Sequence, residues 1–163
     1  MRTKMNILKI IGIAAGAVAV GVSALAIANP GNSAETSADA KDENLRPRKY
    51  RTPLENFVAE TEKIIPTLST YGENWKLISG DGGNEAKNDS AVISAEVPVV
   101  VFTDDLKIKA ESDTEEGFII VNIRSASRVG KNDLGENRRH ITQILQALDE
   151  KFTEKNIDFQ KND

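Results

Sequence analysis

Residues 91–123, AVISAEVPVVVFTDDLKIKAESDTEEGFIIVNI, contain three stretches with the patterns of β-strands. Apolar and polar residues alternate from residue 91 to 96 and again from 105 to 111, so each stretch has one apolar face. Residues 118–123 form a run rich in β-branched side chains, which favour strands. The acidic segment 112–117 is typical of a turn. We therefore predict consecutive antiparallel strands in this part of the chain.

Helical patterns lie on both sides of these strands. Thr52, Pro53 and Glu55 have the spacing of a capping box with Pro at the first helical position, so a helix is expected from residue 53. An apolar stripe marks the last helix and consists of Ile141, Ile144, Leu145, Leu148 and Phe152. Because the helices precede and follow the strands, the pattern predicts an α+β two-layer sandwich. Its antiparallel sheet should have about four strands, flanked by an N-terminal and a C-terminal helix.

The first 28 residues have the charge pattern of a targeting segment. Three cations lie within residues 1–9, residues 10–28 are uncharged, and residues 29–44 carry a net charge of −3. This order predicts that the rest of the chain is extracytoplasmic, in a periplasm or an equivalent lumen. Two alternatives stay open: a signal peptide cleaved near Ala28, or an anchor in the inner membrane, which residues 10–28 are long enough to span.

Composition divides the remaining chain. Residues 29–44 are small, polar and acidic, so we expect a disordered linker. Residues 45–158 should form one α+β domain, and 159–163 a frayed tail. Four cations within residues 46–51 are expected to make a solvated arm.

The chain has no Cys and a single His, which excludes a disulfide framework, a thiolate zinc site and a site with two imidazoles in one chain. We expect no metal and no cofactor. A net charge of −4 gives no indication of a nucleic-acid partner.

A distinctive pattern lies between the last predicted strand and the last helix. Residues 124–130 read RSASRVG, 133–135 read DLG, and 137–139 read NRR. A Phe-Thr-Asp-Asp segment at 102–105 precedes a predicted strand. Together these motifs resemble domain-of-unknown-function family 1499, with the resemblance extending over about residues 75–148. It implies an N-terminal signal or anchor and no assigned activity. Many members open with a Pro-Asn-Cys type motif, which this chain lacks.

The loop has one functional interpretation. Cations and hydroxyl groups precede a helix amino terminus, where free N–H groups favour an anion. Arginine also suits a planar carboxylate or phosphate. The candidate ligand-binding residues are Arg124, Ser125, Ser127, Arg128 and Arg138.

A structural interpretation of the same residues stays open beside it. Asp104 and Asp105 could pair with Arg124 and Arg128 and thereby fix the crossing from strand to helix. The other members of this network are Asp133 as a helix cap, Gly130 and Gly135 at unusual backbone angles, and Asn137 at the start of the helix. His140 is expected at the boundary of the apolar stripe rather than in a site.

The sequence thus favours a non-enzymatic binding or interaction module of the cell envelope. Its partner would be an anionic small molecule or an envelope protein, with membrane contact through residues 10–28 if they are not cleaved. The alternative is an enzyme on an anionic substrate, with Asp104 or Asp105 as acid/base and Arg124 and Arg128 as substrate clamps. No catalytic residue is assigned under the favoured interpretation.

Overall fold

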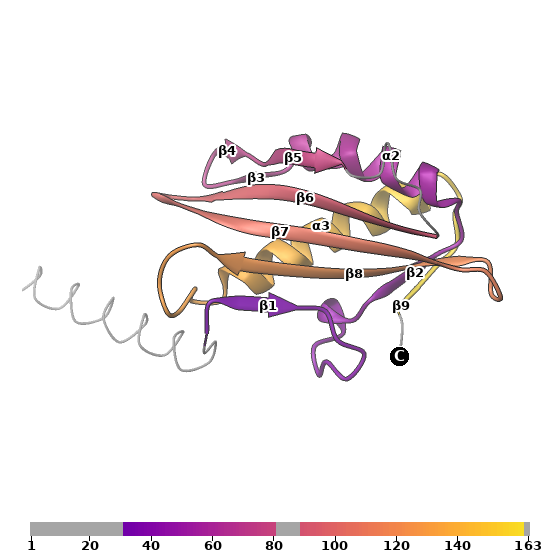
Figure 1. Ribbon diagram of the computed structural model, residues 1–163, viewed down its shortest axis with the longest axis horizontal. Coiled ribbons are helices and arrows are strands. Elements are labelled where there is room, and N and C mark those ends of the chain that lie inside the picture. The colour runs from indigo at the N-terminus through magenta and orange to yellow at the C-terminus, as the bar shows by residue number, and fades with distance from the viewer. Residues whose placement is uncertain (1–30, 81–88, 162–163) are drawn as a thin grey trace, which may run out of the picture.

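Figure 1 shows the computed structural model of the protein, in which residues 31–80 and 89–161 are described. Within these residues the largest element is a seven-stranded sheet in the order β5-β6-β7-β8-β2-β9, with β1 also paired to β8. Its strands are β1 (Ser33–Glu35), β2 (Arg48–Tyr50), β5 (Lys76–Gly80), β6 (Ser90–Val99), β7 (Phe102–Asp113), β8 (Phe118–Ser127) and β9 (Phe159–Lys161). All neighbouring pairs are antiparallel. The predicted antiparallel sheet with helices is confirmed, but it has more than the four or so strands predicted.

The three long central strands follow the predicted alternation. Ile93 of β6, Ile108 of β7 and Ile123 of β8 are register partners across the sheet and are almost completely buried. Lys107 and Lys109 lie between the buried positions of β7 and are exposed. One face of the sheet is therefore apolar and covered, and the other is polar and meets solvent.

Two helices, α2 (Leu54–Ile64) and α3 (Glu136–Glu154), pack against the apolar face (Figure 1). All five residues of the predicted stripe on α3 have 0% exposure. Burying each such side chain contributes about 1.5–3 kcal/mol, so this stripe is a main source of stability. The connections contain 3-10 helices η1 (Glu43–Leu45) and η2 (Ile65–Thr67) and a hairpin of β3 (Ser69–Thr70) and β4 (Glu73–Asn74).

The predicted capping box before α2 is wrong. Helix α2 follows Pro53 without a side-chain cap, and the buried Thr52 Oγ1 has no hydrogen-bond partner within the described chain. The Thr52 N–H instead donates to the Tyr50 carbonyl at 3.0 Å. The tight turn that leaves β2 thus sets the conformation of Thr52 before the helix starts.

Residues 31–44 and 159–161 differ from the predicted linker and tail. β1 pairs with β8, and beyond β1 the Ile123 N–H donates to Thr36 Oγ1 at 3.0 Å. β9 pairs with β2 on the same side of the sheet. The prediction failed because it weighed only apolar burial, whereas an open sheet edge offers backbone hydrogen bonds to any extended segment.

Part of the predicted basic arm, residues 46–51, forms strand β2 of the sheet. Arg48 lies in β2 with 2% exposure, and its Nε donates to Asp149 Oδ2 of α3 at 3.1 Å. Its Nη1 donates to the carbonyl of Arg46 at 2.6 Å. Arg51 at the end of this segment is exposed, as expected.

In residues 31–80 and 89–161, none of the helices combines the length and apolar character needed to cross a membrane. The predicted targeting segment, residues 1–28, lies outside the described residues.

Candidate functional site

At one end of the sheet the covered face becomes polar. The alternation that buries the apolar side chains of β7 and β8 continues to Asp104 on β7 and to Ser125 and Ser127 on β8. The first turns of α3 bring Asn137 and His140 over them, as the contacts below show. We call these five residues the polar cluster. Asp104, Ser125, Asn137 and His140 are each at most 2% exposed.

Asn137 is the centre of the hydrogen bonding in the polar cluster. Ser125 Oγ donates to Asn137 Oδ1 at 2.6 Å, and Asn137 Nδ2 donates to Ser127 Oγ at 3.0 Å. The same Nδ2 also donates to the Asn32 carbonyl at 3.0 Å. One buried amide therefore joins α3, β8 and the segment that leads into β1.

Asp133 caps the start of α3, as the structural interpretation predicted. Its Oδ1 accepts from the Gly135 N–H at 3.0 Å and its Oδ2 from the Asn137 N–H at 2.9 Å. Gly130 and Gly135 have φ values of 100° and 89°, a region that suits glycine. The DLG motif is thus a helix-start device that positions Asn137.

Three atoms around His140 are buried and lack a hydrogen-bond partner in the described chain: Asp104 Oδ2, Glu136 Oε2 and His140 Nε2. Asp104 Oδ2 lies 3.5 Å from His140 Nδ1, and Glu136 Oε2 lies 3.8 Å from His140 Nε2. Buried polar atoms without partners are uncommon and are costly to retain. The concentration of three of them marks this place as unusual.

Burial shifts the pKa of both Asp104 and His140. It raises the pKa of Asp104 above its usual range, against a hydrogen bond from Ser127 that lowers it. Burial, with the nearby Arg139 cation, lowers the pKa of His140 to about 4. The imidazole is therefore neutral at neutral pH and does not balance a charge on Asp104.

A cavity of about 430 Å³ opens beside the polar cluster. Its lining residues range from the buried Asp104 to the highly exposed Val101. Its apolar lining comes from the β3–β4 turn, the β6–β7 turn and the β8–α3 loop: Tyr71, Val99, Val100, Val101, Phe102, Val129 and Leu134. Its polar lining side chains are Asp104, Ser127, Asn132, Asp133 and Glu136. An apolar pocket with a few convergent polar groups is the usual form of a small-molecule site.

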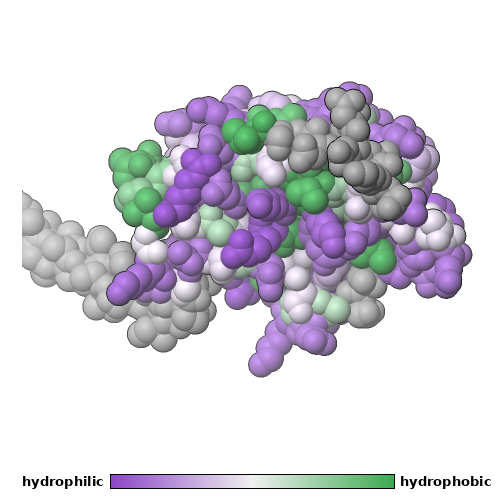
Figure 2. Space-filling model, viewed as in Figure 1, coloured by the Kyte–Doolittle hydropathy of each residue, from purple (hydrophilic) through white to green (hydrophobic). Residues whose placement is uncertain are grey.

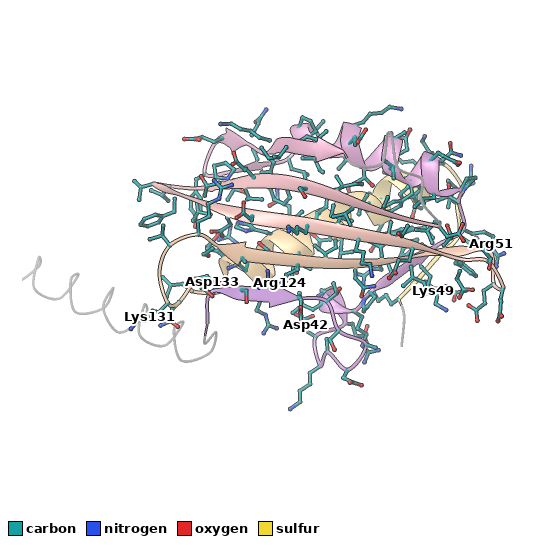
Figure 3. The ribbon with its side chains drawn as sticks, in the orientation of Figure 1. Asp42, Lys49, Arg51, Arg124, Lys131 and Asp133 are labelled. Carbon is teal, nitrogen blue, oxygen red and sulfur yellow. The ribbon has the colours of Figure 1, made fainter. Side chains whose placement is uncertain are left out.

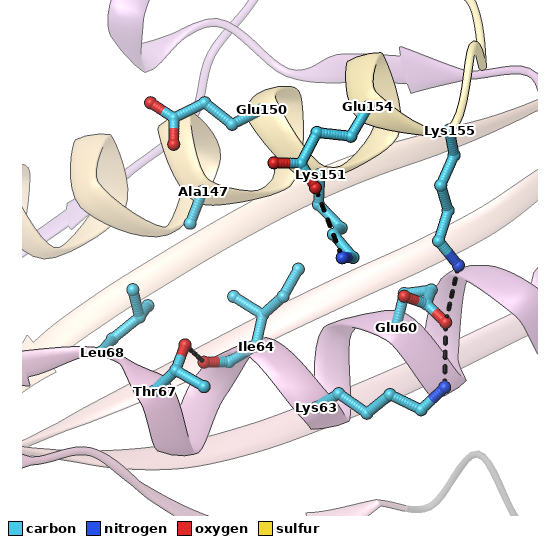
Figure 4. A pocket seen from close by; sticks show the side chains of 10 residues that line it. All are labelled: Glu60, Lys63, Ile64, Thr67, Leu68, Ala147, Glu150, Lys151, Glu154 and Lys155. Carbon is cyan, nitrogen blue, oxygen red and sulfur yellow. Dashed lines mark hydrogen bonds and ion pairs between the residues drawn. The ribbon is translucent and has the colours of Figure 1, made fainter.

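A larger groove of about 670 Å³ lies between α2 and α3 (Figure 4). Glu60 lies in it, 2.9 Å from both Lys63 Nζ and Lys155 Nζ. Hydrogen bonds from these two lysines lower the pKa of Glu60 to about 2. Of the four buried side-chain atoms in the described residues that have no partner, none belongs to this groove. Glu60 pairs with Lys63 and Lys155, and Lys151 pairs with Glu154, so we place the candidate site at the other cavity.

The five predicted ligand-binding residues are spread over different surfaces. Arg124 is exposed on the outer face of β8 (Figure 3). Its neighbour Ser125 is buried on the inner face. Arg138 Nη2 lies 3.7 Å from Asp42 Oδ2. Of these five residues, all in the described part of the chain, only Ser127 lines the cavity.

The predicted carboxylate–arginine pairing is confirmed for one of the two carboxylates. Arg128 Nη2 lies 2.6 Å from Asp105 Oδ1 and 2.5 Å from Glu96 Oε1 on the outer face. Hydrogen bonds to Asp105 and Glu96 raise the pKa of Arg128 above its already high ordinary value. Asp104 faces the opposite side of β7 and contacts Ser127 and His140 instead. Adjacent residues of a strand point to opposite faces, which separates the two aspartates.

The sequence interpretation missed His140 and the apolar lining of the cavity. His140 is 1% exposed, and its ring packs edge-on against Trp75 at 5.9 Å between centroids. The signal for the cavity was present in the run Val99–Phe102, which is apolar although it forms the turn between β6 and β7. The signal for Asp104 was the alternation of apolar and polar residues along β7, which places Asp104 on the buried face.

We expect Arg128→Ala to destabilise the domain much less than Asn137→Ala. The Arg128 side chain is 45% exposed, and solvent screens its ion pairs. Asn137→Ala removes a buried amide and leaves Ser125 and Ser127 without their partner, at about 1–3 kcal/mol. Urea unfolding of the two variants measures this difference. Equal losses would show that the outer ion pairs hold the loop.

Comparison with known proteins adds one match. No curated protein and no solved structure matches the chain significantly. The family described as "Protein of unknown function (DUF1499)" matches residues 24–148. This range includes Asp104, the whole RSASRVG loop and the start of α3 with Asn137 and His140. The match covers most of the chain, and the protein therefore belongs to the DUF1499 family.

Proposed function

We propose that this protein is a non-enzymatic ligand-binding module of the cell envelope and that its ligand occupies the 430 Å³ cavity beside the polar cluster. The observation that carries the proposal is Asp104, a buried residue that has an unpartnered carboxyl oxygen and is one of the lining residues of an apolar cavity. A ligand that donates a hydrogen bond to this oxygen would remove the cost of leaving it unpaired. The charge pattern of residues 1–44 supports an extracytoplasmic location.

The lining indicates the chemistry of the ligand. Carboxyl groups of Asp104, Asp133 and Glu136 line the cavity, and no lysine or arginine is among its lining residues, all of which are described. This lining disfavours an anionic head group and favours an ammonium or another hydrogen-bond donor. The apolar side chains nearer the mouth suit a short hydrocarbon chain. We therefore propose an amphiphile with a donor head group, in place of the anion suggested by the loop sequence.

Binding is favoured over catalysis by the positions of the two aspartates. The alternative enzyme used Asp104 or Asp105 as acid/base with Arg124 and Arg128 as clamps. Asp105 contacts Arg128 on the outer face, and Arg124 also lies on that face. Only Asp104 of these four described residues lines the cavity. The set cannot act together on one substrate.

The ligand proposal predicts a selective stabilisation by cationic amphiphiles. Octylammonium should raise the melting temperature of the protein, whereas octanoate, which has the same chain length and an anionic head, should not. Asp104→Asn should weaken octylammonium binding about 10-fold or more, because a charged hydrogen-bond acceptor is lost. The matched control is Asp105→Asn, a neighbouring change on the outer face, which should bind like the wild type.

The outcomes separate the two ligand classes. Equal binding of octylammonium by Asp104→Asn, Asp105→Asn and wild type would contradict the cavity proposal. Stabilisation by octanoate that is lost in Arg124→Ala or Arg128→Ala would support the anion site predicted from the loop instead. Amide chemical shifts of the β6–β7 turn and the β8–α3 loop locate the bound amphiphile directly.

A further inference from the structure

Exposed apolar side chains gather at the end of the sheet where the cavity opens. Their exposed fractions range from 50% to 77%, and we call the group the apolar end: Tyr71, Val100, Val101, Phe102 and Val129. Figure 2 shows an apolar patch at the same end of the molecule as the β6–β7 turn of Figure 1. Among described residues only two other large apolar side chains, Ile78 and Val92, are comparably exposed. A concentrated patch of this kind marks a contact surface.

The β6–β7 turn at this end has an unfavourable backbone conformation. Val100 has a φ of 52°, a left-handed conformation that β-branched residues rarely adopt. Glycine or asparagine at this position would form the turn with less strain. The valine is therefore better explained by what its exposed side chain contacts than by the formation of the turn.

The chain enters the domain at the same end. The Asp133 N–H donates to the Gly31 carbonyl at 3.1 Å, and the Gly31 N–H donates to Asn132 Oδ1 at 3.2 Å. Asn32 Nδ2 donates to the Gly130 carbonyl at 3.2 Å. Gly31 is thus held against the β8–α3 loop, which carries Val129 of the apolar end.

The uncharged segment 10–28 ends three residues before Gly31. Three residues reach at most about 10 Å, and nineteen uncharged residues approach the thickness of a bilayer core. If the segment is retained as an anchor, it therefore holds the apolar end close to the membrane surface. The opposite end of the sheet carries the acidic turn with Glu115 and Glu116, which anionic lipids repel.

We propose that the apolar end inserts into the interface of the membrane in which residues 10–28 are anchored. Val101 and Phe102 then lie at the boundary of head groups and acyl chains, with the long strands pointing away from the bilayer. This orientation does not depend on the ligand proposed above. It places the mouth of the cavity at the lipid surface.

The chain contains no Cys, so single cysteines can be labelled selectively. We would reconstitute the full chain into phosphatidylcholine–phosphatidylglycerol vesicles, with an NBD fluorophore on Val101→Cys. Two variants serve as controls. Ile78→Cys replaces an apolar residue that is 55% exposed on the edge strand β5, and Glu115→Cys lies in the turn at the opposite end of the sheet.

We expect the label at position 101 to show blue-shifted emission and strong quenching by doxyl-labelled lipids, and the labels at 78 and 115 to show neither. The proposal is overturned if all three labels emit alike and escape the quenching. A second result would also overturn it: doxyl-labelled lipids do not quench the label at 101, and its blue shift disappears when fewer protein molecules are present per vesicle. The apolar end would then contact a second copy of the chain. Circular dichroism of each labelled variant confirms that the fold is retained.

Discussion

Replacing Arg48 by methionine should destabilise the domain by about 3–5 kcal/mol, the usual cost of removing one partner from a buried ion pair. Arg48 is 2% exposed and donates to Asp149 Oδ2 at 3.1 Å. It also donates to the carbonyls of Glu43 and Arg46. Methionine fills a similar volume, so the loss reports the unpaired carboxylate and carbonyls rather than a cavity. The midpoint of urea unfolding measures the effect.

Two further variants test whether the loss of stability comes from the ion pair between Arg48 and Asp149 or from the removal of a positive charge alone. Arg51→Met, at an exposed position over the ring of Phe118, should cost less than about 1 kcal/mol. Adding Asp149→Asn to Arg48→Met should recover part of the loss, because the asparagine is neutral and can still accept the hydrogen bond from the Tyr50 hydroxyl. Arg48→Met that unfolds like Arg51→Met would show that the β2–α3 bridge is not a stabilising contact.

Lowering the pH from 6.5 to 4 should cost the domain about 3 kcal/mol through His140 alone. The pKa of His140 is about 4 in the native state, against 6.5 ordinarily. Between these values the unfolded chain binds the proton and the native chain does not, so stability falls as the pH falls. The difference of pKa values corresponds to about 3 kcal/mol at pH 4. Below the native pKa the loss levels off.

The groups that face His140 do not remove this dependence. Asp104 lies 3.5 Å from its Nδ1, and burial raises the pKa of Asp104 above its ordinary value. The contribution of Asp104 to the pH dependence of stability therefore has the opposite sign. The domain loses stability through this group as the pH rises above 3.8, the ordinary pKa of Asp104. Glu136 is engaged by the Tyr71 hydroxyl and by Arg139.

His140→Gln provides the test because His140 is the only histidine of the chain. Urea unfolding at pH 7, 5.5 and 4.5 should show a steep loss for the wild type and a shallower one for the variant. The absolute stability of the variant is irrelevant, since only the slope with pH reports the imidazole. An unchanged slope would mean that the native structure accepts a charged His140.

Local patterns were enough to predict the centre of the fold. The alternation in β7 and the β-branched run in β8 specify strands whatever lies beside them, because a period of two places every apolar residue on one face. The stripe on α3 works in the same way with the helical period. The Asp133 cap and the turn glycines were likewise predictable, since each acts within a few residues of its own position.

The sequence by itself therefore determined the three long strands, the two helices, the start of α3 and the family. Only the tertiary structure decided that β1 and β9 are strands, because their pairing depends on backbone groups of β8 and β2 that lie far away along the chain. It also buried Arg48 and His140 by placing α3 against β2 and β7. The cavity arises in the same way from three separate connections that meet at one end of the sheet. Its shape depends on distances between segments, and a periodic pattern within one segment carries no information about those distances.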